Sequence, residues 1–184
     1  MNVSNLTLSS SKTGIIFNKG TLNINSGHLY HTASASYDYS CIVNYGTVNM
    51  RGGKITSTDW VAIENYNRVI MTAGTIDAGD NTIWNRNPSG STNPHTTKSD
   101  PAVRISGGKL IGRAVYGATN ISNYGSGYIY ISGATLQNTA NGKLFNLSEN
   151  STGSIYVYNS TLSCGPEIYA ANGTGTCTIE ACNR

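Results

Sequence analysis

The chain has 184 residues, of which only 11% are charged, and its formal net charge is +3. A charge this small and scattered argues against nucleic-acid binding, and no apolar run of about eighteen residues is present, so we expect no membrane insertion. Gly, Asn, Ser, Thr and Tyr are abundant while strong helix formers are sparse, which predicts many short strands joined by glycine and asparagine turns.

The strands are predicted from a recurring apolar-x-apolar pattern, whose alternation points both apolar side chains to one face. In chain order the pairs are Leu6/Leu8, Leu22/Ile24, Val48/Met50, Val69/Met71, Val103/Ile105, Ile129/Ile131, Ile155/Val157 and Cys177/Ile179. Two copies of a longer unit, 42–55 and 63–76, agree at four apolar positions, at Asn-Tyr and at the turn glycines Gly53 and Gly74. A unit of roughly 20 residues is typical of a solenoid, so we expect a stack of about eight coils.

A turn follows each apolar pair, and glycine suits a bend that needs a positive φ. The expected turn glycines are Gly27, Gly53, Gly74, Gly108 and Gly133. Asn159 lies near the same slot in the following unit, and asparagine is the next most tolerant residue at positive φ.

An asparagine recurs two positions after an apolar residue in each unit. The column consists of Asn18, Asn44, Asn65, Asn85, Asn123 and Asn146. Equivalent residues of stacked coils lie roughly 4.8 Å apart, a spacing at which asparagine amides can bond to one another along the stack. We favour this structural ladder over the alternative, a polar stripe that binds a ligand.

The two longest intervals in this column, Asn18 to Asn44 and Asn85 to Asn123, locate two insertions. We therefore expect one domain, 1–184, with insertions at about 31–40 and 86–100 and a C-terminal cap at about 164–184. In solenoids such insertions often lie on the binding face. The alternative is a tolerated surface excursion without a role.

Residues 62–65 (AIEN) and 46–55 (GTVNMRGGKI) resemble the surface repeats of right-handed parallel β-helix proteins. This pectate-lyase-like architecture is found in many secreted or wall-anchored proteins of Gram-positive bacteria. The resemblance implies an all-β, single-stranded, right-handed parallel β-helix with an internal asparagine ladder, and its handedness agrees with the general preference of parallel crossovers. A β-sandwich is the competing fold, but its hairpin turns recur roughly every 8–12 residues.

The outward position between the two apolar residues of each pair forms a row along the solenoid. In the C-terminal half this row and its neighbour place several tyrosines on one face, beside the second insertion. We predict ligand-binding residues Tyr128, Tyr130, Tyr156, Tyr158, Arg104 and His95. Exposed tyrosines suit sugar rings or a protein partner, and the alternative is cross-strand packing that stiffens the sheet.

Four cysteines, Cys41, Cys164, Cys177 and Cys182, show no spacing typical of a zinc site. A disulfide among them is plausible in an exported protein, and free thiols are the alternative, so the connectivity stays open. The N-terminus lacks a basic region followed by an apolar stretch. We expect an extracellular or cell-surface location, with the export signal outside this chain.

Catalytic chemistry is hard to find in this sequence. A glycosidase needs two carboxylates across a cleft, and the nearest candidates are Asp59, Asp77 and Asp80, which could form at most a weak cation site. We expect no catalytic residue, no metal and no cofactor.

The sequence favours a non-catalytic surface module that acts as an adhesin, stalk or filament subunit. It would bind a glycan or a host or neighbour protein through the tyrosines and the 86–100 loop, and head-to-tail self-association is a further option. The alternative is a carbohydrate-active enzyme, lyase-like or hydrolase-like, or a phage-type receptor-binding depolymerase.

Overall fold

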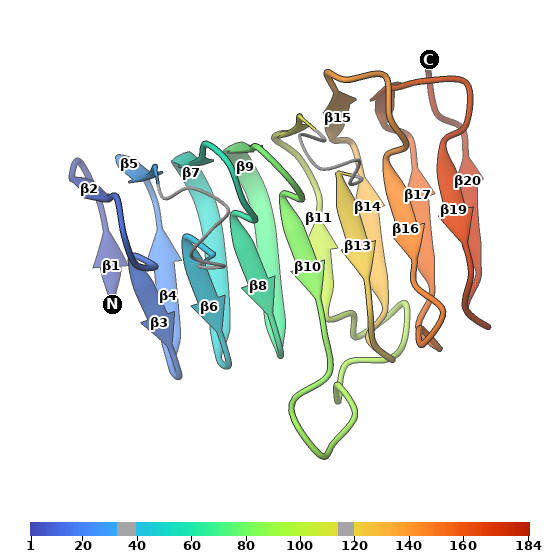
Figure 1. Cartoon of the computed structure of the whole chain (residues 1–184), viewed down its shortest axis with the longest axis horizontal. Coiled ribbons are helices and arrows are strands. Elements are labelled where there is room, and N and C mark those ends of the chain that lie inside the picture. The colour runs from blue at the N-terminus through green and yellow to red at the C-terminus, as the bar shows by residue number, and fades with distance from the viewer. Residues whose placement is uncertain (33–39, 114–119) are drawn as a thin grey trace.

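The computed structural model describes residues 1–32, 40–113 and 120–184, and no helix occurs among them. The chain is a parallel β-helix, because every pairing between its strands is parallel and each coil lies beside the next. The strands follow one another along the long axis of the molecule from the N-terminal to the C-terminal end (Figure 1). The competing β-sandwich is therefore wrong.

The strands form three rows, one on each side of the coil. The first row contains β1 (Asn2–Val3), β4 (Thr21–Ile24), β7 (Thr47–Ser57), β9 (Arg68–Ala78), β11 (Val103–Ile105), β14 (Ile129–Ser132), β17 (Ile155–Tyr158) and β20 (Cys177–Glu180). The second row contains β2 (Thr7–Ser10), β5 (His28–His31), the later halves of β7 and β9, β12 (Lys109–Gly112), β15 (Thr135–Asn138) and β18 (Thr161–Ser163).

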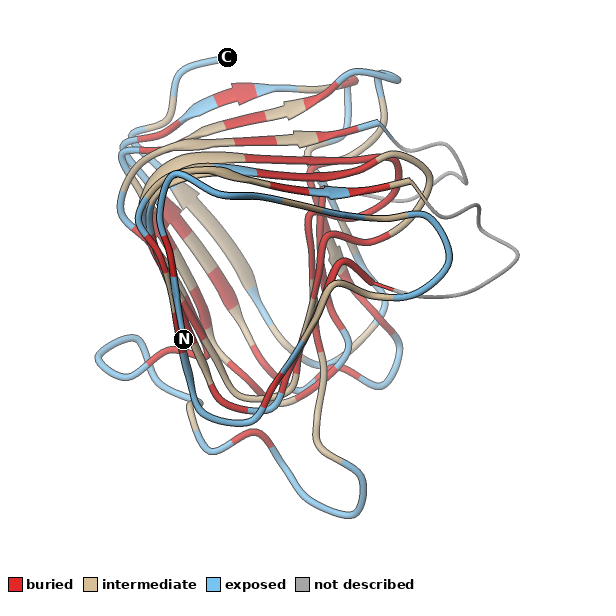
Figure 2. Cartoon of the chain, turned by 90° about the vertical axis from the view of Figure 1, so that its left-hand side faces the viewer, coloured by how far each residue is buried: buried red, intermediate tan, exposed pale blue. Residues whose placement is uncertain are grey.

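The third row is a separate seven-stranded sheet. It contains β3 (Ile16–Asn18), β6 (Ile42–Asn44), β8 (Ile63–Asn65), β10 (Ile83–Asn85), β13 (Ile121–Asn123), β16 (Phe145–Leu147) and β19 (Tyr169–Ala171). Viewed from one end, the coils lie behind one another, with buried segments along their sides and exposed segments at several corners (Figure 2). The segment expected to cap the C-terminal end contributes one further strand to each sheet, β19 and β20.

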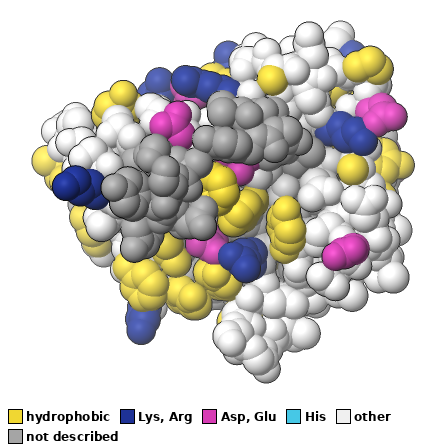
Figure 3. Space-filling view, in the orientation of Figure 1, with side chains coloured by type: hydrophobic (Ala, Val, Ile, Leu, Met, Phe, Trp, Pro, Cys, Tyr) yellow, Lys and Arg dark blue, Asp and Glu magenta, His cyan; other side chains and the backbone are white. Residues whose placement is uncertain are grey.

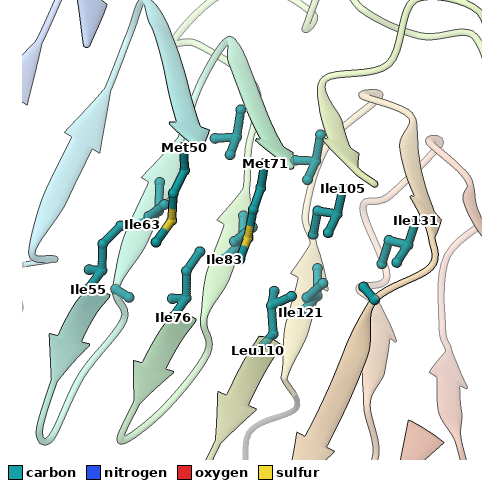
Figure 4. Packing of buried hydrophobic residues seen from close by; sticks show 14 of the residues in the cluster. Met50, Ile55, Ile63, Met71, Ile76, Ile83, Ile105, Leu110, Ile121 and Ile131 are labelled. Carbon is teal, nitrogen blue, oxygen red and sulfur yellow. The ribbon is translucent and has the colours of Figure 1, made fainter. Parts of the chain in front are cut away.

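The core consists of the inward apolar side chains that the alternation predicts. Met50 and Ile55 of β7 and Ile63 of β8 point into the interior of the coil, and Met71 and Ile76 repeat the arrangement in β9 (Figure 4). All five are fully buried. Each such side chain contributes roughly 2 kcal/mol of transfer free energy when it is buried, and only stacking of coils buries it.

One predicted apolar pair, Leu6/Leu8, is wrong. Val3 lies opposite Ile24 and is fully buried, whereas Leu6 is 45% exposed. The Leu6 carbonyl accepts from the backbone of His28, which places Leu6 in the turn between the first two rows. Leu8 lies in β2, the first strand of the second row, opposite Leu29.

The predicted turns have the expected backbone. Positive φ angles occur at all five glycines and at the substituting asparagine, namely Gly27, Gly53, Gly74, Gly108, Gly133 and Asn159. A Cβ at Gly27 would lie 2.3 Å from the Leu6 carbonyl oxygen, so the close approach of neighbouring coils excludes a side chain there in addition to the φ requirement.

The internal asparagine ladder runs through four hydrogen bonds between successive coils. Each Nδ2 donates to the Oδ1 of the next asparagine, from Asn18 to Asn44 (2.7 Å), Asn44 to Asn65 (2.7 Å), Asn65 to Asn85 (2.8 Å) and Asn85 to Asn123 (3.0 Å). The amides of Asn18, Asn44, Asn65 and Asn123 also accept from the backbone N–H two residues further on, as in Gly46 N to Asn44 Oδ1. The ladder therefore fixes both the stacking and the corner.

Asn146 was expected to continue this ladder, and that prediction is wrong. In β16 it lies opposite Ser122, and Leu147 lies opposite Asn123. The reason is that Phe145, and not Leu144, occupies the inward position opposite Ile121, so the strand is shifted by one residue relative to the predicted register.

Candidate functional site

The predicted outward row exists as a continuous register on the first strand row. Arg104 of β11 lies opposite Tyr130 of β14, which lies opposite Tyr156 of β17. The two tyrosine rings are stacked, with centroids 5.7 Å apart and an interplanar angle of 7°. The structure thus brings together three of the six predicted site residues.

The 86–100 insertion, which projects between β10 and β11 (Figure 1), supplies a fourth component that the sequence did not single out. Lys98 Nζ lies 3.5 Å from the Tyr156 ring centroid and 5.7 Å from that of Tyr130. Arg104 Nη2 donates to the carbonyls of Lys98 (3.2 Å) and Ser99 (3.0 Å), and its guanidinium lies 5.1 Å from the Tyr130 centroid. The loop is therefore held against the tyrosine stack.

Asp100 anchors the end of this loop. Its carboxylate accepts from Arg68 Nη2 (2.6 Å) and lies 2.9 Å from His95 Nδ1. The contact with His95, together with the nearby Arg68, lowers the pKa of Asp100. His95 accepts a backbone hydrogen bond from Tyr128 (2.9 Å), so these two predicted site residues lie at the base of the loop and position it.

Asn93 fixes the other side of the loop, and it is fully buried. Its Nδ2 donates to the Asn67 carbonyl (3.2 Å), and its Oδ1 accepts from His95 N (3.0 Å). Asn93 N in turn donates to Asn87 Oδ1 (3.1 Å). The sequence offered only a weak signal for this role, because the whole segment is rich in polar and turn-forming residues.

The loop and the tyrosine row enclose an open depression of 570 Å³. It is lined by Thr97, Lys98, Ser99, Arg104 and Tyr130. We call it the basic tyrosine site and include the stacked Tyr156 in it. Two cations and two hydroxyl groups surround an aromatic floor. The arrangement offers electrostatic attraction, hydrogen-bond donors and flat apolar area to one ligand.

Tyr158 lies outside this depression. It follows Tyr156 by two residues on β17, opposite Ser132 and Glu180, and is 44% exposed. The Tyr156 hydroxyl donates to Glu180 Oε2 (2.6 Å), and this bond raises the pKa of Tyr156. Tyr158 therefore extends the exposed surface beside the basic tyrosine site.

Of the three candidate acids, Asp77 is engaged and Asp80 is buried, while Asp59 is half-buried. Asp77 is held by Arg113 through two hydrogen bonds (3.1 and 3.0 Å), and it lies 3.6 Å from Lys54 Nζ. Asp80 is almost fully buried, and burial raises its pKa to about 6. Within residues 1–32, 40–113 and 120–184, no group of three His, Cys, Asp or Glu side chains is arranged to hold a metal ion.

The four cysteines are free thiols. Cys41 is fully buried and Cys177 is half-buried, and burial raises the pKa of both thiols to about 12. Both are therefore protonated at neutral pH, which makes them weak nucleophiles.

No helix in the described part of the chain is long and apolar enough to cross a membrane. Most of the first predicted insertion, 33–39, lies outside the described residues.

Comparison of the chain with protein-family models, with curated proteins and with solved structures gave no match.

Proposed function

We propose that this chain is a non-catalytic, extracellular β-helix module that binds an acidic glycan at the basic tyrosine site. The observation that carries the proposal is the convergence of Lys98 and Arg104 on the stacked rings of Tyr130 and Tyr156. An aromatic floor suits the apolar face of a sugar ring, and the cations suit its carboxylate or sulfate groups.

The loop that carries Lys98 supports the same proposal. It is held by Asp100, Asn93 and Arg104 before any ligand arrives, so little conformational entropy is lost on binding. Thr97 and Ser99, on either side of Lys98 in the lining of the depression, add hydroxyl groups that can bond to sugar hydroxyls. A rigid rod that displays such a loop suits an adhesin or stalk of a Gram-positive surface protein, as the repeat resemblance implies.

A glycan array probed with the wild-type chain tests the proposal. We expect binding to acidic oligosaccharides that weakens as salt is added, because exposed charges are screened. Lys98→Ala should weaken this binding about tenfold, while Lys12→Ala, which removes an exposed lysine from another part of the chain, should leave it unchanged. Equal losses in the two variants, or no binding to any acidic glycan, would contradict the proposal.

A further inference from the structure

An aromatic belt, distinct from the basic tyrosine site, runs along the seven-stranded sheet and the corner that follows it. Hydrophobic side chains gather over the middle strands of this sheet, with basic side chains between and beside them (Figure 3). The belt consists of Phe17, Tyr45, Tyr66, Trp60, Trp84 and Tyr124. The corner tyrosines each follow a rung of the asparagine ladder, so the ladder sets their spacing.

In the N-terminal half of the belt Tyr45 and Tyr66 cover one another, while Phe17 is tilted by 42° against Tyr45. Tyr45 and Tyr66 stack with centroids 4.5 Å apart and an interplanar angle of 4°, and Phe17 lies 5.3 Å from Tyr45. At this short and nearly parallel spacing each ring covers much of its neighbour's face, whereas the centroids of Tyr130 and Tyr156 are 5.7 Å apart. The Tyr45–Tyr66 pair is therefore a packed surface that stiffens the corner.

The stack is interrupted one coil later, because the next corner residue is Arg86. Backbone bonds from Arg86 N to Asn65 O and from Tyr124 N to Asn85 O show that Arg86 follows Tyr66, and Tyr124 follows Arg86, along the corner. The Arg86 guanidinium lies 5.7 Å from the Tyr66 centroid and 5.7 Å from that of Trp84. It takes the place of one ring in the stack.

Beyond this interruption the rings cross instead of stacking. Trp84 meets Tyr124 at 58°, so these two rings leave space between them, and Trp60 packs edge-on against Trp84 at 74°. A pocket of 210 Å³ lies between Trp84, Arg86 and Tyr124. Tyr124 is 41% exposed and the Arg86 side chain is 43% exposed, so the pocket walls are accessible from solvent.

The charge of this pocket is balanced. Arg86 Nη1 bonds to Glu64 Oε1 (2.5 Å), and the same oxygen accepts from the Tyr66 hydroxyl (2.7 Å). The guanidinium also repels cations, so a quaternary ammonium ligand is disfavoured, while the paired carboxylate removes the attraction for anions. What remains is two aromatic walls with hydrogen-bonding groups at the rim.

We infer that the Trp84–Arg86–Tyr124 pocket binds one ring of a neutral oligosaccharide. Its volume is below the roughly 300–1,000 Å³ of pockets for drug-sized ligands, which matches a single ring with the rest of the chain outside. Sugar C–H groups stack on the aromatic walls, and the guanidinium donors bond to hydroxyl groups at the edge. The site lies on a different sheet from the basic tyrosine site and does not depend on it.

The chain offers its own reporter, because it contains only two tryptophans. Trp60→Phe leaves Trp84 as the single indole fluorophore and keeps an aromatic ring beside it. We would titrate this variant with neutral tetrasaccharides built from glucose, mannose, xylose or N-acetylglucosamine. At least one series should shift the Trp84 emission saturably, and saturation-transfer NMR on the wild-type chain should place the contact on sugar C–H protons.

Three variants in the Trp60→Phe background decide the assignment. Tyr124→Ala should weaken the response about tenfold, while Tyr45→Ala, an equally exposed corner tyrosine in the covered half of the belt, should leave it unchanged. Lys98→Ala should also leave it unchanged, which separates this site from the basic tyrosine site. The inference would be overturned if no sugar shifted the Trp84 emission or gave a saturation-transfer signal. It would also be overturned if Tyr124→Ala and Tyr45→Ala weakened the response equally.

Discussion

Truncation of one rung in the middle of the asparagine ladder, Asn65→Ala, tests the central stabilising feature of the fold. Asn65 is fully buried. Its Nδ2 donates to Asn85 Oδ1 (2.8 Å) and to the Asn67 carbonyl (3.2 Å), and its Oδ1 accepts from Asn44 Nδ2 (2.7 Å). After truncation Asn44 Nδ2 keeps two backbone carbonyls, at 3.0 and 2.9 Å, but Asn85 Oδ1 loses its ladder donor.

The cost follows from these bonds. Because Asn44 Nδ2 keeps two acceptors, the main losses are the bond to Asn85 Oδ1, about 1 kcal/mol, and the penalty of about 1–3 kcal/mol for leaving that buried oxygen without a donor. We therefore expect Asn65→Ala to lower the free energy of unfolding by about 3 kcal/mol. Urea unfolding followed by circular dichroism measures this directly, and an unchanged slope with denaturant indicates that stability alone has changed.

Two matched truncations control for the loss of an asparagine as such. Asn18, the first rung, also donates to Asn44 Oδ1, but that oxygen keeps the Gly46 N–H (3.2 Å), so Asn18→Ala should cost only about 1 kcal/mol. Asn146 lies outside the ladder, and its truncation should fall within about 0.5 kcal/mol of the wild type. Equal costs for all three truncations would refute the ladder as a source of stability.

Four further changes have defined outcomes. Val69→Asp places a charge at a fully buried position and should abolish the folded circular dichroism spectrum, because an unpaired buried charge is intolerable. Burial raises the pKa of Asp80 to about 6, so the folded state holds this proton more tightly than the unfolded state. The Asp80 contribution to stability is then lost as pH rises from about 4 to about 6. Asp80→Asn should therefore exceed the wild type in free energy of unfolding by about 2–3 kcal/mol at pH 7 but by almost nothing at pH 4. A difference in urea unfolding that does not change with pH would contradict this. Asp100→Ala should speed hydrogen exchange in the 93–100 loop and weaken acidic-glycan binding with little change in melting temperature, because the Asp100 side chain is 52% exposed. Arg86→Tyr should restore a ring to the corner stack and remove the neutral-sugar response of the Trp60→Phe reporter, at a stability cost within about 1 kcal/mol.

The repeat was predictable from sequence because each coil places the same residue types at the same positions. Val48, Val69 and Val103 lie opposite one another as the alternation predicts. The register becomes ambiguous where two alternations compete. In the segment around Leu144, Phe145 and Leu147 every apolar residue is buried, so the period of two alone could not decide which residue faces the interior.

The candidate sites were less predictable because they depend on contacts between distant segments. The tyrosine row follows from the repeat, but the position of Lys98 over Tyr156 depends on how the 86–100 loop folds back. That path is set by side-chain bonds such as Asp100 to Arg68 and Asn93 to Asn67, which span 32 and 26 residues. A local pattern carries no information about such pairings.

Both candidate sites arise where the repeat is broken, and the physics of stacking explains why. A regular coil satisfies its own groups: asparagine amides bond to asparagine amides, and tyrosine rings cover tyrosine rings, as at Tyr45 and Tyr66. Such a surface leaves few faces or donors free for a ligand. Arg86 removes one ring from the stack and opens the faces of Trp84 and Tyr124. Lys98 reaches the tyrosine row only because an insertion leaves the coil. In a solenoid the repeats provide the stable frame, and the departures from them provide the binding groups.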